Sequence, residues 1–400
     1  MRIVTRVAII AAAIAAVTLL ASCGGGGGPE PEPPPQTFSK CDTSATENGD
    51  VAAAESGAGG LTGSESAPAP EGVLGWTMRY CSTGRDDSIV EVTGLLATPD
   101  GDAPEGGWPL IAFAHGTAGL GDQCAPSTSG IEKMLYLETF IGAGYAIVAS
   151  DFAGLGTDGI PGFLIGESEG RSVLDSARAA RGISGANIGP QTMIVGYSQG
   201  GHAALFAGEL APTYAPEIDV VAVAALAPPT DLTELTDVRF NEPNSFDTAA
   251  PLIASWVDYY GQDPSSLVTA QGAEVLDIVV NECTGRLPQA QGPVDDFLQA
   301  SLLDIPEWAA LLEENSTGQS AIAAPVFIAQ GGRDKLVPLE VTRSAIPDLC
   351  AINDNLRYQE YDGVSHGNLR LAAADDMLQF LADGLAGQPS EVGADCASVN

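Results

Sequence analysis

A serine in the pattern Gly-x-Ser-x-Gly is the residue of this chain best placed to act as a nucleophile. The sequence Thr192-Met-Ile-Val-Gly196-Tyr-Ser198-Gln-Gly200 is an apolar run that ends at the serine, and an Ala-rich segment typical of a helix follows it. This order indicates a strand, a sharp turn that carries the serine, and a helix. Glycine at positions 196 and 200 lets strand and helix pack closely, so we expect the Ser198 hydroxyl to be free to attack a carbonyl carbon.

A second Gly-x-Ser-x-Gly match, Gly166-Glu-Ser168-Glu-Gly170, lacks this context. Pro161 and Gly162 interrupt the preceding residues, so no buried strand is expected to lead into the match. The glutamates on both sides of Ser168 would also oppose the formation of an alkoxide. We therefore do not expect Ser168 to be a nucleophile.

A serine nucleophile needs a general base, and the base needs a group that orients it. The chain has three histidines. His202 lies four residues after Ser198, where a helix would direct it away, and His115 precedes the serine. In α/β hydrolases the acid follows the serine and the histidine follows the acid, an order that only His366 can satisfy. We predict that His366 is the base and that His115 shapes its own loop.

The orienting acid is expected in the turn after a predicted strand at 325–329. That turn reads Gln-Gly-Gly-Arg-Asp334-Lys-Leu-Val-Pro, in which Asp334 is the one carboxylate. We predict that Asp334 orients His366. Three other aspartates stay open as alternatives, and each is also a residue type that turns favour: Asp348, Asp354 and Asp362.

Acyl transfer also requires N–H donors for the negative charge that develops on the carbonyl oxygen. We expect one donor to be the backbone amide of Gln199, directly after Ser198. The other is expected in the loop after a predicted strand at 109–114, which reads His115-Gly116-Thr117. The Thr117 amide is the candidate, and its hydroxyl could assist. This chemistry needs no metal and no cofactor, and we predict none.

The predicted strands and helices indicate an α/β fold with a mostly parallel central sheet flanked by helices. Several strands are continuous apolar runs, as expected of strands buried on both faces. Strands are predicted at 76–82, 89–98, 109–114, 146–150, 192–197, 220–226, 325–329 and 357–361. Helices are predicted at 130–142, 169–181, 200–210 and 369–383. The first two strands have no helix between them and are expected to form an antiparallel hairpin at the edge of the sheet.

The predicted strands and helices alternate along the chain, but residues 231–321 show helical patterns alone. Two sets of apolar residues in it recur at helical spacing: Ile253, Trp256, Val257 and Tyr260, then Val294, Phe297, Leu298 and Leu302. Because the segment follows the strand at 220–226, it is expected to cover the carboxyl end of the sheet, where Ser198 would lie. We predict a helical lid at 231–321, between core segments at 71–230 and 322–400.

The N-terminal residues have the features of an export signal. Arg2 and Arg6 precede an apolar run too short to span a bilayer. The sequence Leu20-Ala-Ser-Cys23 resembles a bacterial lipobox, in which the cysteine is lipidated. We predict a signal peptide at 1–22 and an exported bacterial lipoprotein, anchored through Cys23 to the outer membrane or cell surface. Residues 23–70 are expected to be a disordered, Gly- and Pro-rich tether. The alternative is an ordinary secretory signal in which the cysteine is incidental.

Cysteine content and charge restrict the possible partners. If Cys23 carries lipid, an even number of cysteines remains, which in an exported chain favours disulfides over a metal site. These residues are Cys41, Cys81, Cys124, Cys283, Cys350 and Cys396. The chain has 52 Asp and Glu against 16 Lys and Arg, so a nucleic-acid partner is excluded because phosphate binding requires the opposite sign. We interpret the charge as a solvated acidic surface and expect a monomer.

Several motifs together make the chain resemble secretory lipases of the Candida lipase A type, in their bacterial branch, within the α/β-hydrolase superfamily. The motifs are Asp122-Gln-Cys-Ala-Pro-Ser127, Asp151-Phe-Ala-Gly-Leu-Gly-Thr157, Gly166-Glu-Ser-Glu-Gly-Arg-Ser-Val-Leu-Asp175, Gly196-Tyr-Ser-Gln-Gly-Gly-His202, Gly332-Arg-Asp334 and Ser365-His-Gly367. The resemblance implies an esterase or lipase with a helical lid and a Ser-His-Asp triad, which here would be Ser198, His366 and Asp334. It also implies the disulfides Cys124–Cys283 and Cys350–Cys396, which leaves Cys41–Cys81. The chain departs from the fungal members at His115-Gly116-Thr117, where they carry a Tyr-x-Asp type sequence.

We therefore predict a serine ester hydrolase, a lipase or esterase, that acts through an acyl-enzyme on small-molecule or lipid esters such as triacylglycerols. Two alternatives stay open. One is a serine peptidase on the same fold, although no propeller repeat is visible. The other is a surface lipoprotein that uses this fold for binding without catalysis.

Overall fold

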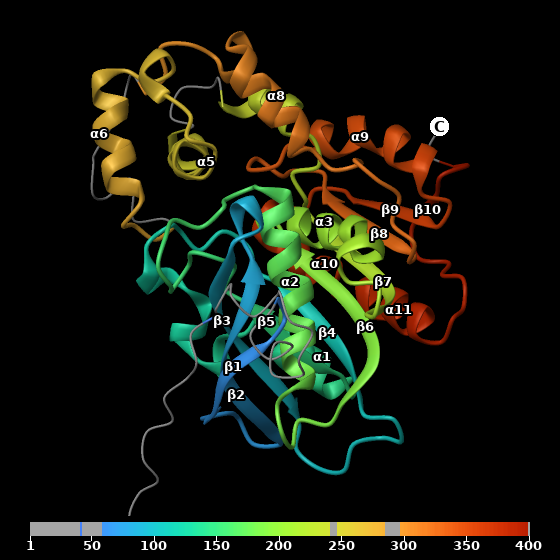
Figure 1. Ribbon diagram of the computed structural model, residues 1–400. Helices are drawn as coiled ribbons and strands as arrows, with labels where there is room; N and C mark the ends of the chain where they lie inside the picture. The colour runs from blue at the N-terminus through green and yellow to red at the C-terminus, as the bar shows by residue number, and fades with distance from the viewer. Residues whose placement is uncertain (1–40, 42–57, 241–245, 285–296, 399–400) are drawn as a thin grey trace, which may run out of the picture. The chain divides into compact units, whose positions relative to one another are not determined.

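The structure is a computed structural model that describes Cys41 and residues 58–240, 246–284 and 297–398. A ten-stranded sheet runs through these residues in the order β1-β2-β3-β5-β4-β6-β7-β8-β9-β10 (Figure 1). Neighbouring strands from β5 across to β9 are parallel, and β1, β2, β3 and β10 are antiparallel to their neighbours. The predicted α/β fold is thus confirmed. The strands are β1 Leu61–Ala67, β2 Val73–Thr83, β3 Ile89–Pro99, β4 Trp108–Ala114, β5 Ala146–Ser150, β6 Ile188–Tyr197, β7 Asp219–Leu226, β8 Val326–Gly331, β9 Leu356–Tyr361 and β10 Ala394–Asp395.

The eight predicted strands correspond to β2 through β9, but the sheet extends further than predicted at both edges. The predicted hairpin is the antiparallel pair β2 and β3, yet it is not the edge, because β1 pairs with β2 on the outer side. Strand β1 corrects the prediction that all of residues 23–70 form a tether. Its sequence, Leu-Thr-Gly-Ser-Glu-Ser-Ala, is polar and partly exposed, as suits an edge strand, so it carries no apolar alternation to detect. The predicted signal peptide and Cys23 lie outside the described residues.

Helices cover both faces of the sheet. One face carries α2 Gly166–Arg181, α3 Gln199–Tyr214 and α9 Leu339–Ile352, and the other carries α1 Leu137–Gly142, α10 His366–Ala372 and α11 Ala374–Leu385. Successive side chains of a strand point to opposite faces. In β4, Leu110 and Ala112 accordingly pack in the core under α2 and α3, and Ile111 and Phe113 pack in the core under α1 and α11. This two-sided burial explains the continuous apolar runs.

The predicted helices differ in how well they match. Those at 169–181 and 200–210 are confirmed as α2 and α3. The prediction at 130–142 holds only for its second half, because Tyr136 has a left-handed φ of 63° and α1 begins after it. The prediction at 369–383 spans two helices, since α10 ends at Ala372 and α11 begins at Ala374. Helix α9 was not predicted.

A helical insertion lies between β7 and β8. It contains α4 Leu232–Leu235, a π-helix at Thr236–Phe240, α5 Phe246–Tyr260, α6 Ala270–Val279, a 3-10 turn at Leu302–Asp304 and α8 Pro306–Glu314. The insertion has its own core, in which the rings of Trp256 and Trp308 stack with centroids 6.1 Å apart. Phe163 and Val337 of the sheet domain join that core. Figure 1 shows α5, α6 and α8 grouped together at one end of the sheet.

One of the two predicted helical faces in this insertion is wrong. Ile253, Trp256, Val257 and Tyr260 lie in α5 as predicted. The second set does not form a helix over its described residues: Leu298 forms a β-bridge with Val268, and the 3-10 turn that contains Leu302 starts only there. Backbone bonds from Thr269 N to Phe297 O and from Gln299 N to Leu267 O replace helical ones. Val294 lies outside the described residues.

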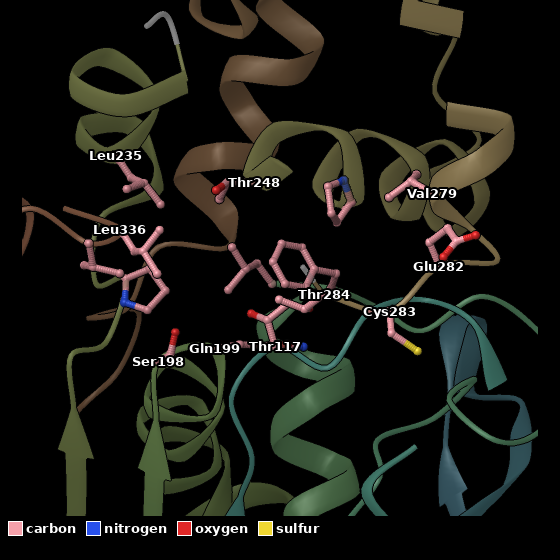
Figure 2. Close-up of a pocket in the computed structure, with 16 residues that line it drawn as sticks. Thr117, Ser198, Gln199, Leu235, Thr248, Val279, Glu282, Cys283, Thr284 and Leu336 are labelled. Atoms are coloured by element: carbon pink, nitrogen blue, oxygen red, sulfur yellow. The ribbon is translucent and has the colours of Figure 1, made fainter. Parts of the chain in front are cut away.

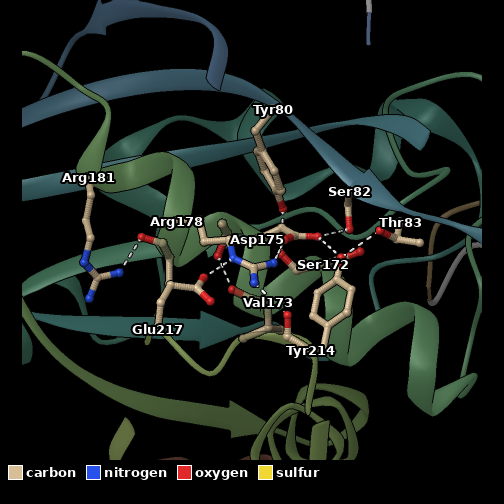
Figure 3. A network of polar contacts seen from close by, with 12 residues as sticks. Tyr80, Ser82, Thr83, Ser172, Val173, Asp175, Arg178, Arg181, Tyr214 and Glu217 are labelled. Atoms are coloured by element: carbon tan, nitrogen blue, oxygen red, sulfur yellow. Dashed lines mark hydrogen bonds and ion pairs between the residues drawn. The ribbon is translucent and has the colours of Figure 1, made fainter. Parts of the chain in front are cut away.

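A buried polar cluster fixes α2 to β2 and α3 (Figure 3). Asp175 of α2 accepts hydrogen bonds from Ser82 at 2.7 Å, Tyr214 at 2.6 Å and Arg178 at 2.7 Å. Burial raises the pKa of Asp175, and these three donors act against that rise by stabilising the ionised form. Because Ser82 belongs to β2 and Tyr214 to α3, the cluster fixes the position of α2 against both elements.

Three disulfides join distant parts of the chain: Cys41–Cys81, Cys124–Cys283 and Cys350–Cys396. The pairing implied by the family resemblance is confirmed. Cys283 belongs to the helical insertion and Cys124 to the sheet domain, so this bond ties the two together. Within the described residues, no helix is long and apolar enough to cross a membrane.

Candidate active site

Ser198 lies at the sharp turn between β6 and α3, as its sequence pattern predicts. Its backbone has φ 59° and ψ −124°, a conformation that residues with a side chain rarely adopt. Positions 196 and 200 must both be glycine, because the backbone of another segment lies very close to each of them. A Cβ on Gly196 would lie 1.8 Å from the carbonyl oxygen of Gly200, and one on Gly200 would lie 1.9 Å from the carbonyl oxygen of Ala114 in β4. Only glycine lets the helix start this close to the sheet.

The structure brings the three residues predicted as a triad into hydrogen-bond contact. His366 Nε2 lies 2.9 Å from Ser198 Oγ, and His366 Nδ1 lies 2.6 Å from Asp334 Oδ2. His366 begins α10, just after β9, and Asp334 follows β8, so both lie at the carboxyl ends of neighbouring parallel strands. The three aspartates kept as alternatives are all exposed on the surface: Asp348, Asp354 and Asp362.

The carboxylate of Asp334 is held on both oxygens. Oδ1 accepts from the backbone amides of Leu336 and Val337, each at 2.9 Å, and Oδ2 accepts from the side-chain amide of Gln330 at 3.2 Å as well as from His366. The side chain of Asp334 is fully buried. Because the carboxylate is an acceptor, the proton of a neutral His366 lies on Nδ1, which leaves Nε2 free to accept the Ser198 proton.

Tyr197 supports the histidine from the side, a contact that the sequence reasoning did not find. Its hydroxyl donates to the backbone carbonyl of His366 at 3.0 Å, and the two rings lie 5.1 Å apart. Burial, with a smaller effect of the Asp334 charge, raises the pKa of Tyr197 to about 12. The tyrosine therefore stays neutral and able to donate at physiological pH. Its place directly before Ser198 is the one signal that the sequence offers.

The loop His115-Gly116-Thr117 runs directly beside the serine. A Cβ on Gly116 would lie 3.5 Å from Ser198 Cβ, which places this loop against the turn. Thr117 and Gln199 line the same cavity as Ser198, and Figure 2 shows the three along one wall of it. His115 turns away from this wall, because its ring nitrogens face the backbone carbonyls of Gly116 and Asp151.

The cavity next to Ser198 has a volume of about 240 Å³ and lies between the sheet domain and the helical insertion. Figure 2 shows Leu235, Thr248 and Val279 of the insertion facing the Ser198 wall. Most of the remaining lining is apolar, and Leu336 closes the side nearest the serine. Side chains of this kind suit an acyl chain better than a polar or charged group. The lining includes Phe163, Leu164, Pro229, Pro251 and Val337.

The imidazole of His202 forms no hydrogen bond with the Ser198 hydroxyl and belongs to a buried network. Its Nδ1 lies 3.1 Å from Glu169 Oε2, and its Nε2 lies 2.7 Å from the backbone carbonyl of Asn315 in the segment that leaves the helical insertion. The side chain of Asn315 in turn donates to the hydroxyl of Tyr260 in α5. The network thus joins the nucleophile helix, α2 and the insertion. Ser168 lies in the first turn of α2, not at a strand end, and does not contact His366.

No group of three or more His, Cys, Asp or Glu side chains in the described part of the chain is arranged to hold a metal ion. The site contains a hydroxyl, a histidine in hydrogen-bond contact with it and a carboxylate that orients the histidine, and Thr117 and Gln199 line the same cavity.

Known proteins resemble this chain in sequence and in fold. The model of the secretory lipase family matches residues 123–254, which include Ser198 and end before Asp334. A protein described as a probable inactive lipase from Mycobacterium tuberculosis is 24% identical, over 80% of this chain and 75% of its own length. A secreted triacylglycerol lipase of Malassezia restricta is 24% identical over 64% of this chain, which spans only 57% of that protein.

The solved structure of Candida antarctica lipase A superposes with a TM-score of 0.72 at 20% identity, covering 86% of this chain and 87% of the other. At that identity the likeness shows the fold. The family match covers the serine turn, the helix before it and the start of the helical insertion. The chain is thus similar to secretory lipases over residues 123–254 and shares the α/β-hydrolase fold of Candida antarctica lipase A.

Proposed function

We propose that this protein is a serine carboxylic-ester hydrolase, a lipase or esterase, that uses Ser198, His366 and Asp334 as its catalytic triad. The observation that carries the proposal is the continuous hydrogen-bond line from Ser198 Oγ through His366 to Asp334, next to a mostly apolar cavity. A buried carboxylate, a tautomer-locked histidine and a hydroxyl on a strained turn have little purpose in a merely structural contact.

In the proposed reaction, Ser198 Oγ attacks the carbonyl carbon of the ester while its proton passes to His366 Nε2. The tetrahedral intermediate collapses when the bond to the alcohol oxygen breaks, and the same proton leaves with the alcohol. Water then attacks the acyl-enzyme, again losing a proton to His366. The acid is released and Ser198 takes its proton back. Asp334 stays ionised throughout and stabilises the imidazolium that forms twice.

The backbone amides of Thr117 and Gln199 are the proposed donors to the oxyanion. Both residues line the cavity beside Ser198, and Gln199 is the first residue of α3, where a backbone N–H has no partner within its own helix. A donor of this kind contributes about 3–4 kcal/mol to transition-state stabilisation in enzymes where it was removed. The acyl chain would lie in the apolar cavity, so acyl esters and triacylglycerols are the proposed substrates.

The test is hydrolysis of p-nitrophenyl esters, from acetyl to palmitoyl, by the wild type and by Ser198→Ala. Loss of the nucleophile in a serine hydrolase lowers kcat by about 10⁶-fold, so no ester should be cleaved by the variant above background. Ser168→Ala is the matched control, because it changes the serine of the other Gly-x-Ser-x-Gly sequence, and it should keep its activity. Equal activity of Ser198→Ala and wild type would exclude the proposed nucleophile. A folded protein without activity on any ester would favour a binding role or a peptide substrate.

We also propose that the protein is exported and anchored to a membrane through a lipid on Cys23. Three disulfides support an oxidising compartment, and the residues before Cys23 support lipidation. Labelling of cells with an alkyne fatty acid should mark the wild type and should leave Cys23→Ser unmarked. Label on the variant, or none on the wild type, would contradict the anchor.

A further inference from the structure

A second space reaches the triad from the side of the histidine. This hollow of about 600 Å³, here called the His366 hollow, is lined by Arg333, Asp334, Lys335, Leu336, Ser365, His366 and Gly367. Leu336 lines both this hollow and the cavity beside Ser198, so the two spaces adjoin at the catalytic residues. The proposed reaction uses the cavity for the acyl chain and leaves the His366 hollow without an occupant.

The direction of proton transfer decides which part of an ester lies in this hollow. His366 Nε2 must return a proton to the alcohol oxygen as it leaves, so that oxygen has to lie within hydrogen-bond distance of the imidazole. The oxyanion points to the amides of Thr117 and Gln199, and the acyl chain extends under the helical insertion. The alcohol is thus the part of the substrate that faces His366.

The hollow carries two positive charges that form no ion pair within the described residues. Arg333 and Lys335 are both exposed, one on each side of Asp334, and neither forms an ion pair with a described residue. The one carboxylate in the lining is Asp334, which is buried and bonded to His366. Most other arginines of the described chain are paired, among them Arg79 with Glu91, Arg178 with Asp175 and Arg343 with Glu360.

This arrangement is unusual in a chain with a formal net charge of −36. The field of so acidic a surface repels anionic solutes in general. Arg333 and Lys335 therefore form a local region of positive charge beside the base, at the point where the alcohol of an ester would lie. Backbone contact between Arg333 N and Val364 O, at 2.8 Å, holds the turn with the cations against the loop that carries His366.

We propose that the His366 hollow binds the alcohol part of esters whose alcohol is anionic, with a phosphate or carboxylate close to the ester oxygen. This inference rests on the proposed function and specifies its substrate class. Arg333 and Lys335 contact the anion, and His366 protonates the neighbouring alcohol oxygen. An acylated glycerol phosphate, the unit found in phospholipids, has this chemistry.

The experiment compares two pairs of esters that differ only in the anion. One pair is a monoacylglycerol and the acyl glycerol phosphate with the same acyl chain, below the concentration at which either forms micelles. The other is an O-acyl lactate and its methyl ester, which tests a carboxylate instead of a phosphate. For each pair the readout is the ratio of kcat/KM for the anionic ester to kcat/KM for the neutral ester.

The double variant Arg333→Gln/Lys335→Gln should lower this ratio by about two- to thirtyfold, since an exposed charge pair contributes a modest amount and there are two. The control is Arg79→Gln/Arg343→Gln, which removes the same two charges from other surfaces and should leave the ratio unchanged. A ratio that is the same in the double variant and the wild type, for both pairs, would overturn the proposal. A fall for one pair alone would identify the anion that is recognised.

The wild type provides a measurement that does not depend on a variant. Raising the salt concentration from about 0.02 M to about 0.5 M shortens the screening length well below 10 Å, so the ratio should fall. A ratio that does not change with salt would also contradict the proposal. If the neutral esters themselves are not cleaved, or if Ser198→Ala cleaves them equally well, the proposed function fails. A failure of the anionic subsite alone leaves neutral-ester cleavage intact.

Discussion

The carboxylate of Glu169 accepts a hydrogen bond from the side-chain amide of Gln199, the residue directly after Ser198, at 2.7 Å. The same oxygen accepts from the amide of Leu164 at 3.0 Å, and the other oxygen faces His202. Glu169 and His202 are both almost completely buried. His202 Nε2 also faces a carbonyl oxygen, so both ring nitrogens lie next to acceptors. Glu169 and His202 therefore form a buried hydrogen-bonded pair, which holds the residue whose backbone amide is the proposed oxyanion donor.

Glu169→Gln should lower stability and slow catalysis together. The new side chain would place an NH₂ group where N–H donors need an acceptor, and a buried donor left without a partner costs about 1–3 kcal/mol. We expect a fall in kcat larger than any change in KM, because the oxyanion donor acts on the transition state. Urea unfolding and ester hydrolysis measure the two effects.

Glu167→Gln is the matched control for this prediction. Glu167 lies two residues earlier on the same helix, is 54% exposed and pairs with Arg171 at the surface. Its replacement should change stability by less than about 1 kcal/mol and leave kcat unaltered. If Glu169→Gln behaved like this control, the pair would have no part in positioning Gln199.

Gly200→Ala should disrupt the site, whereas Gly142→Ala should be harmless. A Cβ at position 200 would lie 1.9 Å from the carbonyl oxygen of Ala114, a backbone atom that cannot move aside, whereas nothing lies within 4 Å of a Cβ at position 142. Overpacking typically costs 1–3 kcal/mol, and this overlap should cost about 3 kcal/mol or more. Gly142→Ala lies in a helix and should stabilise the protein by about 0.5–1 kcal/mol. Thermal unfolding of both variants distinguishes the cases, and equal melting temperatures would refute the steric argument.

Removal of the disulfide Cys124–Cys283 should affect both stability and substrate binding. The two cysteines are 159 residues apart, and the chain-entropy model gives about 5 kcal/mol for a loop of this length. Cys283 also lines the cavity, so the serine double variant should raise KM for acyl esters. The control is the serine double variant at Cys350 and Cys396. This disulfide joins residues 46 positions apart and does not line the cavity, so its loss should lower stability by about 4 kcal/mol without raising KM. A KM that rises equally in both variants would argue against a role of Cys124–Cys283 in shaping the cavity.

The proposed triad could be predicted from the sequence because chain order left few choices. With three histidines, one of them after the serine and outside its helix, His366 could be assigned without any knowledge of distances. Asp334 followed from the rule that catalytic residues lie after the carboxyl ends of parallel strands. The strands themselves were detectable because burial on both faces removes polar residues from them, as in β4 and β6.

Contacts between distant segments could not be predicted in the same way. Glu169 and His202 each read as ordinary helical residues, and only the packing of α2 against α3 makes them a pair. Strand β1 is polar because it is an edge strand, so its pattern resembled a tether. The apolar spacing at 297–302 fitted a helix, but pairing with residues 267–269 supplied its backbone bonds instead. In each case the deciding partner lies far away in the sequence.

Glu209 should make part of the stability depend on pH. At the end of α3 its carboxylate accepts from the backbone amides of Gly318, Gln319 and Ser320, and so fixes the segment that returns from the helical insertion. Burial raises its pKa from 4.5 to about 6, and the three amide donors only partly oppose that rise. Between these two pH values the folded protein holds more protons than the unfolded chain, so the free energy of unfolding falls as pH rises.

The total decrease from this group should be about 2 kcal/mol, at 1.36 kcal/mol for each pKa unit. The measurement is urea unfolding of the wild type and of Glu209→Gln at pH values from 4 to 7. The stability of the wild type relative to the variant should be greatest below pH 4.5 and should decline until the carboxyl is ionised, above pH 6. A difference that stays constant or increases over this range would mean that the carboxylate is ionised at no cost, and that its three amide donors fully offset its burial.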